Sequence, residues 1–311
     1  MKKDLLGLKD ISAKEIENIL ETAGTMKLIL GQPNKKTPHL QGKTVVNLFY
    51  ENSTRTRLSF ELAAKYMSAN AANITASGSS VQKGETLIDT AETINAMGTD
   101  ILVMRHNMSG APHLIAPLVS ASVINAGDGG HQHPTQTLTD LLTIRSLTGR
   151  LDNMTIGLCG DLKFGRTVHS LIEAMVRYPN VKFVLIAPDE LKVPSYIRDD
   201  VLKAHNVEFK EVNSLDAAMP ELDILYMTRV QKERFFNEED YIRLKDSYIL
   251  NKEKMKLAKD SMFVLHPLPR VNEISTEVDS DPRAAYFKQV QYGMYVRMAL
   301  IMTLLEVQKP C

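Results

Sequence analysis

Short apolar, β-branched runs recur along this chain, and helix-compatible segments separate most of them. Parallel strands need a crossover of a dozen or more residues between them, which is usually a helix. The alternation is therefore typical of parallel sheets covered by helices on both faces, and we predict an α/β fold. The predicted strands are residues 44–50, 72–75, 100–105, 122–125, 154–160, 182–187, 207–212, 223–228 and 262–267.

The length of the chain favours two domains rather than one. It has 311 residues, whereas single domains commonly contain about 100 to 200 residues. Turn formers and charged residues separate a helical pattern from the strand that follows it, so we predict domains at 1–149 and 150–311. A last amphipathic helix is predicted at 282–308, with Asp281 as its N-cap and Pro282 in its first turn. We expect this helix to pack back on the first domain.

The charge balance excludes several kinds of partner. Lys plus Arg total 37 and Asp plus Glu total 37, so the formal net charge is zero. Such a chain lacks the overall field that attracts nucleic acid or an anionic membrane, and we predict neither as a partner. The two cysteines, Cys159 and Cys311, do not suggest a disulfide framework and favour a reducing compartment, which we take to be the cytoplasm. No apolar run approaches the length of a signal-peptide core or a membrane span.

The sequence STRTR, residues 53–57, joins a predicted strand to a predicted helix. A helix N-terminus carries free N–H groups, and Ser53, Thr54 and Thr56 add hydroxyl donors beside them. Arg55 offers a planar guanidinium that suits phosphate. An N-cap with a solvated basic turn is the simpler alternative, but capping does not require so many donors. We predict a phosphate site here and interpret Arg57 as a structural ion-pair partner.

Other polar side chains follow the next predicted strands of the first domain. Ser79 and Lys83 lie in a glycine-punctuated loop, which a flexible loop with a capping serine would also explain. Arg105 ends a strand, where a structural salt bridge is the alternative. Pro134 fits a first helical turn, so that His133 lies beside the cap and Gln136 one turn inside the helix. We expect His133 to act as a hydrogen-bond donor, with a structural histidine as the alternative.

Metal and nucleotide sites are not supported by the spacing of the motifs. His131 and His133 are close in sequence, but no Cys, Asp or Glu set with ligand spacing follows them, and we predict no metal and no cofactor. The segment 157–171 contains several glycines, but they do not give G-x-G-x-x-G, and no P-loop is present.

A shared position links the candidate site residues. Open parallel sheets bind ligands beyond the carboxyl ends of their strands. We therefore predict one cleft between the two domains that holds several cations and almost no candidate base or nucleophile. Such a cleft suits two anionic reactants and a reaction driven by charge stabilisation. The residues placed at strand ends are Ser53, Arg105, His133, Arg166, Arg229 and Leu268.

Together these motifs resemble the transcarbamylase superfamily over essentially the whole chain. The motifs STRTR and HPTQ are similar to those of the superfamily as a whole, whereas GDLKFGRTVHS and HPLPR resemble the branch that uses aspartate. The remaining motifs that carry the likeness occur in the same order, and they are SVQKGETL, MRH and MTRVQKER.

The resemblance implies a reaction between carbamoyl phosphate and L-aspartate, which gives N-carbamoyl-L-aspartate and phosphate early in pyrimidine (UMP) synthesis. It also implies a homotrimer with shared active sites, since Ser79 and Lys83 would reach in from a neighbouring subunit. Regulatory chains are a further partner that the resemblance leaves open.

The roles of single residues are likewise implied by the resemblance. Thr56, Arg105 and His133 would polarise the carbamoyl carbonyl, with Arg55 as the fourth catalytic residue. Gln136 and the backbone carbonyls of Pro267 and Leu268 would bind the carbamoyl amino group. The phosphate ligands would be Ser53, Thr54, Arg55, Thr56, Ser79, Lys83 and Arg105. The aspartate ligands would be Lys83, Arg166, Arg229, Gln231 and Leu268.

Two alternatives stay open at this point. The nearest is an ornithine carbamoyltransferase, or a relative that uses another amino acid. Ornithine carries a cationic side chain, which two arginines and Gln231 would not favour. The other is a non-catalytic anion-binding or assembly protein with the same fold.

Overall fold

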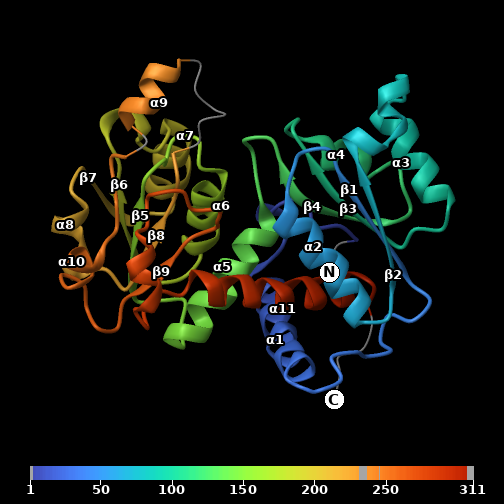
Figure 1. The fold of residues 1–311 in the computed structure, drawn as a ribbon, viewed down its shortest axis with the longest axis horizontal. Coiled ribbons are helices and arrows are strands. Elements are labelled where there is room, and N and C mark those ends of the chain that lie inside the picture. The colour runs from blue at the N-terminus through green and yellow to red at the C-terminus, as the bar shows by residue number, and fades with distance from the viewer. Residues whose placement is uncertain (1–2, 231–236, 245, 307–311) are drawn as a thin grey trace. The chain divides into compact units, whose positions relative to one another are not determined.

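The computed structural model describes residues 3–230, 237–244 and 246–306 of the chain. The chain forms two compact units (Figure 1), Met1–Leu142 with Gln291–Cys311, and Thr143–Val290. It passes between the units within two helices, α5 (Pro134–Thr148) and α11 (Tyr286–Leu304). As predicted, each unit is built on a parallel sheet flanked by helices.

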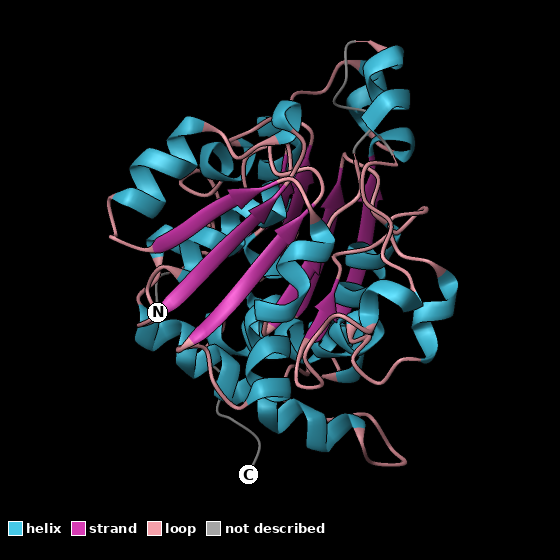
Figure 2. Cartoon of the chain, turned by 90° about the vertical axis from the view of Figure 1, so that its left-hand side faces the viewer, coloured by secondary structure: helices cyan, strands magenta, loops and turns pink. Residues whose placement is uncertain are grey.

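The first unit contains a four-stranded sheet in the order β2-β1-β3-β4. All its strands are parallel, and Figure 2 draws the strands of the chain as magenta arrows among the cyan helices. Its strands are β1 (Thr44–Phe49), β2 (Asn70–Thr75), β3 (Ile101–His106) and β4 (Ser122–Asp128). Its helices, apart from α5 and α11, are α1 (Ala13–Leu30), α2 (Thr54–Tyr66), α3 (Leu87–Ala96) and α4 (Ala111–Ile115).

Both faces of this sheet are covered. Every residue of β3 and β4 is buried, so consecutive side chains, which point to opposite faces, are all withdrawn from water. One face forms a hydrophobic cluster in which Leu48, Leu102 and Met104 pack with Ile94 of α3 and Ile115 of α4. The apolar runs that predicted β3 and β4 are therefore strands whose two faces are both covered.

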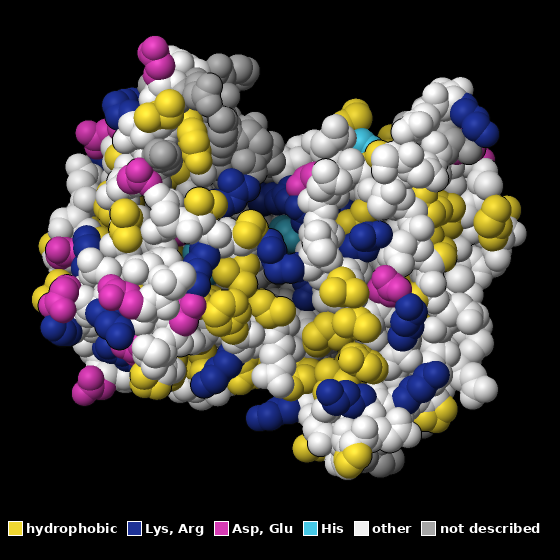
Figure 3. All heavy atoms as spheres, in the orientation of Figure 1, with side chains coloured by type: hydrophobic (Ala, Val, Ile, Leu, Met, Phe, Trp, Pro, Cys, Tyr) yellow, Lys and Arg dark blue, Asp and Glu magenta, His cyan; other side chains and the backbone are white. Residues whose placement is uncertain are grey.

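The second unit contains a five-stranded parallel sheet in the order β7-β6-β5-β8-β9. Its strands are β5 (Met154–Cys159), β6 (Val181–Ile186), β7 (Glu208–Val212), β8 (Ile224–Met227) and β9 (Phe263–Leu265). Its helices are α6 (Arg166–Met175), α7 (Ser195–Ile197), α8 (Leu215–Ala218), α9 (Glu238–Leu244) and α10 (Lys252–Met255). On the face seen in Figure 3, acidic and basic side chains are interspersed over this unit.

The start predicted for the last helix is wrong. Helix α11 begins at Tyr286 rather than at Pro282. The residues before it extend the edge of the sheet instead: Val264 donates its N–H to the carbonyl of Arg283 at 2.9 Å, and Ala285 donates to the carbonyl of Val264 at 2.9 Å. The carboxylate of Asp281 pairs with Arg283 rather than capping a helix. The pairing with β9 thus delays the helix by one turn.

None of the described helices combines the length and the apolar character needed to cross a membrane.

Candidate active site

The strand order reverses once in each sheet, and several candidate residues follow the strands that flank these reversals. In the first unit the chain leaves β1 for β2 on one side and later returns to β3 on the other. In the second unit the same reversal lies between β5 and β8. Ligands of open parallel sheets bind at such switch points, beyond the carboxyl ends of the strands. The sequence predicted the strand ends, but not the order that makes these two positions special.

The STRTR segment lies at the reversal of the first sheet. Ser53 is the N-cap of α2, with φ −157° and ψ 97°, and its side chain makes no capping hydrogen bond. Thr54 and Arg55 are exposed, and Thr56 is buried. A helix N-terminus with an unused cap hydroxyl leaves N–H and O–H donors available for an anion. The first turn of α2 contains no acidic residue that would compete for them.

Arg105 lies at the end of β3, beside the last residue of β1, because Phe49 and Arg105 are in register. Its side chain is mostly buried. Nη2 lies 2.5 Å from Oε1 of Glu51, and Nη1 donates to the carbonyl oxygen of Ala126 at 3.2 Å. Arg105 thus also forms a salt bridge, which was the alternative prediction for this residue. Glu51 was missed by the sequence analysis, although it stands two residues before STRTR.

His133 is held between Arg105 and Thr135. Its Nε2 lies 3.3 Å from Nη1 of Arg105, and its Nδ1 lies 3.3 Å from the hydroxyl of Thr135. A guanidinium can only donate, so Nε2 accepts in this arrangement, and the neutral ring carries its proton on Nδ1. The Thr135 hydroxyl can donate or accept, so it also satisfies the other neutral tautomer. His133 can therefore present a donor at Nε2 once another acceptor takes the Arg105 proton.

The other candidate residues of the first unit are Gln136, Ser79 and Lys83, which differ in exposure and in hydrogen bonding. Gln136 lies in the first turn of α5, is partly exposed, and donates Nε2–H to Asp140 at 2.7 Å. Ser79 and Lys83 follow β2, the edge strand, and Lys83 is exposed at the end of a one-turn 3₁₀ helix. Ser79 donates to the carbonyl of Ala76 at 3.2 Å.

His131 lies outside this arrangement. Its Nδ1 is 3.0 Å from Oδ2 of Asp128. Within the described ranges, no group of three or more His, Cys, Asp or Glu side chains is placed to hold a metal ion.

In the second unit, the loops that carry Arg166 and Arg229 are joined at the ends of β5 and β8. Arg166 is the first residue of α6, and Arg229 follows β8 by two residues. Thr228 donates its N–H to the carbonyl of Cys159 at 2.8 Å, and its hydroxyl accepts the N–H of Asp161 at 3.0 Å. These bonds fix the two loops to each other.

Gly160 makes this close approach feasible. Its φ is +116°, and a Cβ there would overlap the carbonyl oxygen of Thr228. A residue with a side chain would meet both a backbone clash and an unfavourable conformation. The glycine therefore lets the strand ends that precede Arg166 and Arg229 lie side by side.

Pro267 and Leu268 follow β9, the next strand in the sheet. Leu268 has φ +55°, which is uncommon for a residue with a side chain, and donates its N–H to Nδ1 of His266 at 2.7 Å. Nε2 of His266 donates to Oε1 of Glu273 at 2.7 Å. A buried histidine–glutamate pair thus holds the Leu268 backbone in place. Gln231 lies outside the described residues.

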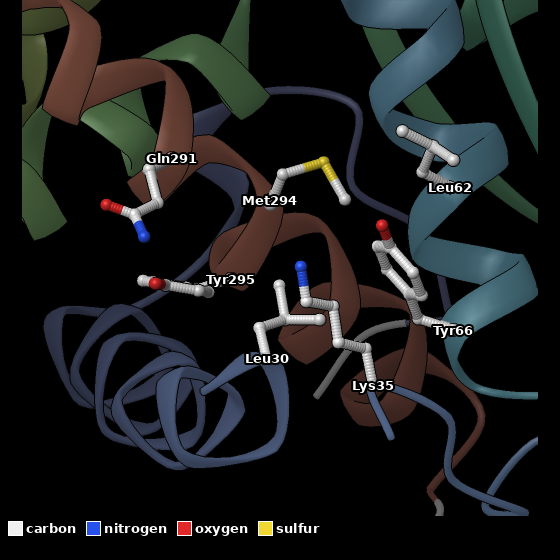
Figure 4. Close-up of a pocket in the computed structure, with 7 residues that line it drawn as sticks. All are labelled: Leu30, Lys35, Leu62, Tyr66, Gln291, Met294 and Tyr295. Carbon is white, nitrogen blue, oxygen red and sulfur yellow. The ribbon is translucent and has the colours of Figure 1, made fainter. Parts of the chain in front are cut away.

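A separate cavity of about 210 Å³ lies in the first unit among α1, α2 and α11 (Figure 4). The side chains of Lys35 and Tyr66 point into it. Its lining residues on α2, Leu62 and Tyr66, are eight and twelve residues beyond Thr54, and a helix rises about 1.5 Å per residue, so they lie about 12 and 18 Å along the helix from the STRTR turn. The cavity is not the candidate phosphate site. Its lining residues are Leu30, Lys35, Leu62, Tyr66, Gln291, Met294 and Tyr295.

Two parallel-sheet units with basic side chains at the carboxyl ends of their strands suit a two-domain enzyme that acts on anionic substrates, and comparison with protein families identifies the class. Residues 3–146 match the aspartate/ornithine carbamoyltransferase, carbamoyl-P binding domain, and residues 152–304 match the Asp/Orn binding domain. The chain belongs to the aspartate/ornithine carbamoyltransferase family.

The relatives share nearly the full length of the chain. It is 59% identical over 306 residues to the aspartate carbamoyltransferase catalytic subunit of Lachnoclostridium phytofermentans, covering 98% of both chains. The catalytic subunit of M. jannaschii aspartate transcarbamoylase is similar in structure, with a TM-score of 0.91, 45% identity and 98% of each chain covered. Aspartate transcarbamoylase from Trypanosoma cruzi, in complex with carbamoyl phosphate and aspartate, gives a TM-score of 0.90 at 38% identity, over 96% of this chain and 95% of that one.

Proposed function

We propose that the STRTR turn, Arg105 and His133 form the carbamoyl phosphate half of the active site in the reaction that this chain catalyses, the aspartate carbamoyltransferase reaction. In that reaction the carbamoyl group of carbamoyl phosphate is transferred to the amine of L-aspartate, which gives N-carbamoyl-L-aspartate and phosphate. The observation that carries the proposal is the position of Arg105, which contacts His133 at the switch point where α2 begins.

The phosphate ligands are Ser53, Thr54, Arg55, Thr56 and Arg105. The N-terminus of α2 supplies N–H groups aimed beyond the end of β1, and the guanidinium groups supply fixed positive charge. Because phosphate leaves in the reaction, these donors stabilise the negative charge that it gains. Little covalent work is then left to the protein.

The carbamoyl carbonyl is polarised by Thr56, Arg105 and His133. When the amine attacks the carbonyl carbon, negative charge grows on the carbonyl oxygen, and donors fixed at that oxygen lower the barrier. Loss of one such donor typically reduces the rate by about 100-fold or more. Gln136 and the backbone carbonyls of Pro267 and Leu268 accept hydrogen bonds from the carbamoyl amino group.

The carboxylates of aspartate are bound by Arg166, Arg229 and Gln231, with Lys83. Arg166 and Arg229 follow neighbouring strands, and Thr228 ties together the loops that carry them, so one small dicarboxylate can be offered both cations. Leu268 completes this half. The two halves form one cleft between the carbamoyl phosphate-binding domain, residues 1–149, and the aspartate-binding domain, residues 150–311.

Transfer is direct, without a covalent enzyme intermediate. The best protein nucleophile by type would be a cysteine thiolate. Cys159, the one cysteine among the described residues, is fully buried, and burial raises the pKa of its thiol, so it stays protonated and out of reach of a substrate.

The assembly in this proposal is a homotrimer in the cytoplasm. Ser79 and Lys83 lie after the edge strand β2, and they enter the site of a neighbouring subunit.

The function is tested by incubating the purified chain with carbamoyl phosphate and either L-aspartate or L-ornithine. Equal amounts of carbamoyl-aspartate and phosphate are expected with aspartate, and no carbamoylated product above the uncatalysed rate with ornithine. Faster turnover of ornithine would contradict the aspartate assignment. Phosphate binding without turnover of either amine would favour a non-catalytic anion-binding protein.

A further inference from the structure

Among the described residues, Gln136 is the one proposed ligand of the carbamoyl group that has an amide side chain. A buried carboxylate, that of Asp140, lies next to it. Asp140 of α5 is fully buried, and its Oδ1 accepts Nε2–H of Gln136 at 2.7 Å. We propose that Asp140 is a positioning residue that fixes the orientation of the Gln136 amide, so that its Oε1 accepts a hydrogen bond from the carbamoyl amino group. This inference rests on the proposed function, because it assigns Gln136 to that amino group.

The orientation follows from hydrogen-bond chemistry. Residues four apart on a helix lie on the same face, so the side chains of Gln136 and Asp140 meet. An ionised carboxylate only accepts hydrogen bonds, whereas a glutamine amide has a donor end and an acceptor end. The donor end must therefore face Asp140. The acceptor end, Oε1, then faces away from Asp140, and the Gln136 side chain is partly exposed.

A buried cation, Arg297, interacts electrostatically with Asp140. Arg297 of α11 is 5% exposed, and its guanidinium lies over the ring of Phe60 at 5.3 Å. Burial lowers the pKa of Arg297 to about 10, and the negative charge of Asp140 acts in the opposite direction. Arg297 is therefore charged at neutral pH. The carboxylate of Asp140 and the guanidinium of Arg297 therefore attract each other across the interior of the first unit.

Helix α11 has a glycine, Gly293, where a side chain would overlap Arg297. A Cβ at Gly293, one turn earlier on α11, would overlap Nη1 of Arg297. Glycine inside a helix is less favourable than alanine, so its presence at this position has a packing reason. Phe60 belongs to α2, the helix whose N-terminus carries the phosphate ligands. Asp140, Arg297 and Phe60 thus connect α5, α11 and α2 behind the carbamoyl phosphate half.

The fixed acceptor makes a distinction between acyl phosphates. Carbamoyl phosphate presents an amino group to Oε1 of Gln136, whereas acetyl phosphate presents a methyl group that has no hydrogen to donate. In Asp140→Asn, the new amide can face Gln136 with either its oxygen or its nitrogen. Both orientations of Gln136 then become accessible, and one of them sets its NH₂ group against the NH₂ group of the substrate.

The test is calorimetric titration of the full chain with carbamoyl phosphate and with acetyl phosphate. Asp140→Asn is expected to weaken carbamoyl phosphate about tenfold, the usual loss for an unpaired polar group, and acetyl phosphate less than about twofold. In a Gln136→Ala background, Asp140→Asn should leave the ratio of the two affinities unchanged, because the residue acts through Gln136. Equal weakening of both ligands, or a change of the ratio that persists without Gln136, would overturn the proposal.

A second measurement does not depend on the folding of Asp140→Asn. In the ¹⁵N-labelled wild-type chain, the side-chain NH₂ resonances of Gln136 are assigned by their loss in Gln136→Ala. One of its protons should exchange with water more slowly than those of exposed glutamines, since it is bound to a buried carboxylate. Exchange as fast as that of exposed glutamines would contradict the proposal. A wild-type chain without carbamoyl-aspartate production would instead contradict the proposed function.

Discussion

Nη2 of Arg105 lies 2.5 Å from Oε1 of Glu51 in the first unit. The guanidinium proposed for the substrate thus already has a carboxylate partner, on the loop that leads from β1 into the STRTR turn. A phosphate that binds here must share Arg105 with Glu51 or displace it. Glu51 therefore both holds Arg105 in place and opposes the binding of an anion.

Replacement of Glu51 by glutamine is expected to strengthen the binding of inorganic phosphate. The change removes one negative charge beside the site and keeps the shape of the side chain. The Glu51 side chain is 25% exposed, so solvent screens its charge in part. We expect a decrease of the Kd by about fivefold, or about 1 kcal/mol, measured by titration calorimetry at low salt.

Glu61→Gln is the matched control for this prediction. Glu61 lies on α2, the helix that follows this loop, but it pairs with Lys65 at 2.6 Å and accepts from Asn73 at 2.9 Å. Its removal should leave the Kd for phosphate within about twofold of wild type. An equal gain in both variants would mean that only the net charge matters, and no gain in Glu51→Gln would mean that the pair does not oppose phosphate.

Subunits with different defects should complement each other. Arg55→Ala chains and Lys83→Ala chains are each expected to lack activity. When equal amounts of the two chains assemble at random, a site that takes Arg55 from one chain and Lys83 from the next has one chance in four of receiving both, so about one quarter of wild-type activity should return. Mixed trimers seen by native mass spectrometry without restored activity would contradict shared sites.

Gly160→Ala should destabilise the second unit and weaken aspartate binding together. The methyl group would overlap the carbonyl of Thr228, and the backbone has φ +116°. We expect a loss of about 1–3 kcal/mol in the free energy of unfolding, measured with urea, and a raised KM for aspartate. Gly24 is exposed on α1, and a Cβ added there would meet no heavy atom outside its own helix backbone within 4 Å. Gly24→Ala should therefore stabilise the chain by about 0.5–1 kcal/mol. An unchanged KM for aspartate in Gly160→Ala would show that this turn does not position Arg166 and Arg229 for aspartate.

Stability should fall on mild acidification. Burial lowers the pKa of His106, His169 and His266 below the ordinary value of 6.5. Between 6.5 and these lowered values the unfolded chain binds more protons than the folded chain, so the free energy of unfolding rises with pH there. The stability that these three histidines contribute as neutral groups should be fully present above pH 6.5. It should be lost as the pH falls below 6.5, and the loss should level off below their pKa values in the folded chain.

The variant His266→Asn tests the origin of this slope. It should reduce the pH dependence below 6.5 by up to about one proton, while the effect of the substitution stays constant above pH 7. Urea titrations across pH 5–8 supply the comparison. An identical slope in the variant would show that His266 does not contribute to it.

The fold was predictable because its signal is local. Strands such as β3 and β4 are buried at every position, so they appear in the sequence as short continuous apolar runs. Their carboxyl ends were equally visible, and within each unit the predicted cations do lie at those ends. Whether the two groups meet in a single cleft stays a prediction.

What the sequence did not indicate depends on pairing between distant segments. Glu51 meets Arg105 only because Phe49 and Arg105 are in register across β1 and β3. The start of α11 was missed because a local Asp-Pro signal gave way to the pairing of Ala285 with Val264. The environment of Asp140 likewise requires Arg297, more than 150 residues away in the chain. Each of these contacts is set by tertiary packing.

The most direct test of the central claim is the affinity of a bisubstrate analogue that carries a phosphonate and an L-aspartate group on one molecule. If cations of both units act on one substrate pair, Arg55→Ala and Arg229→Ala should each weaken the analogue by about 100-fold, as expected for the loss of a charged ligand group. Inorganic phosphate should be weakened only by Arg55→Ala. Wild-type affinity for the analogue in Arg229→Ala would contradict a site shared by the two units.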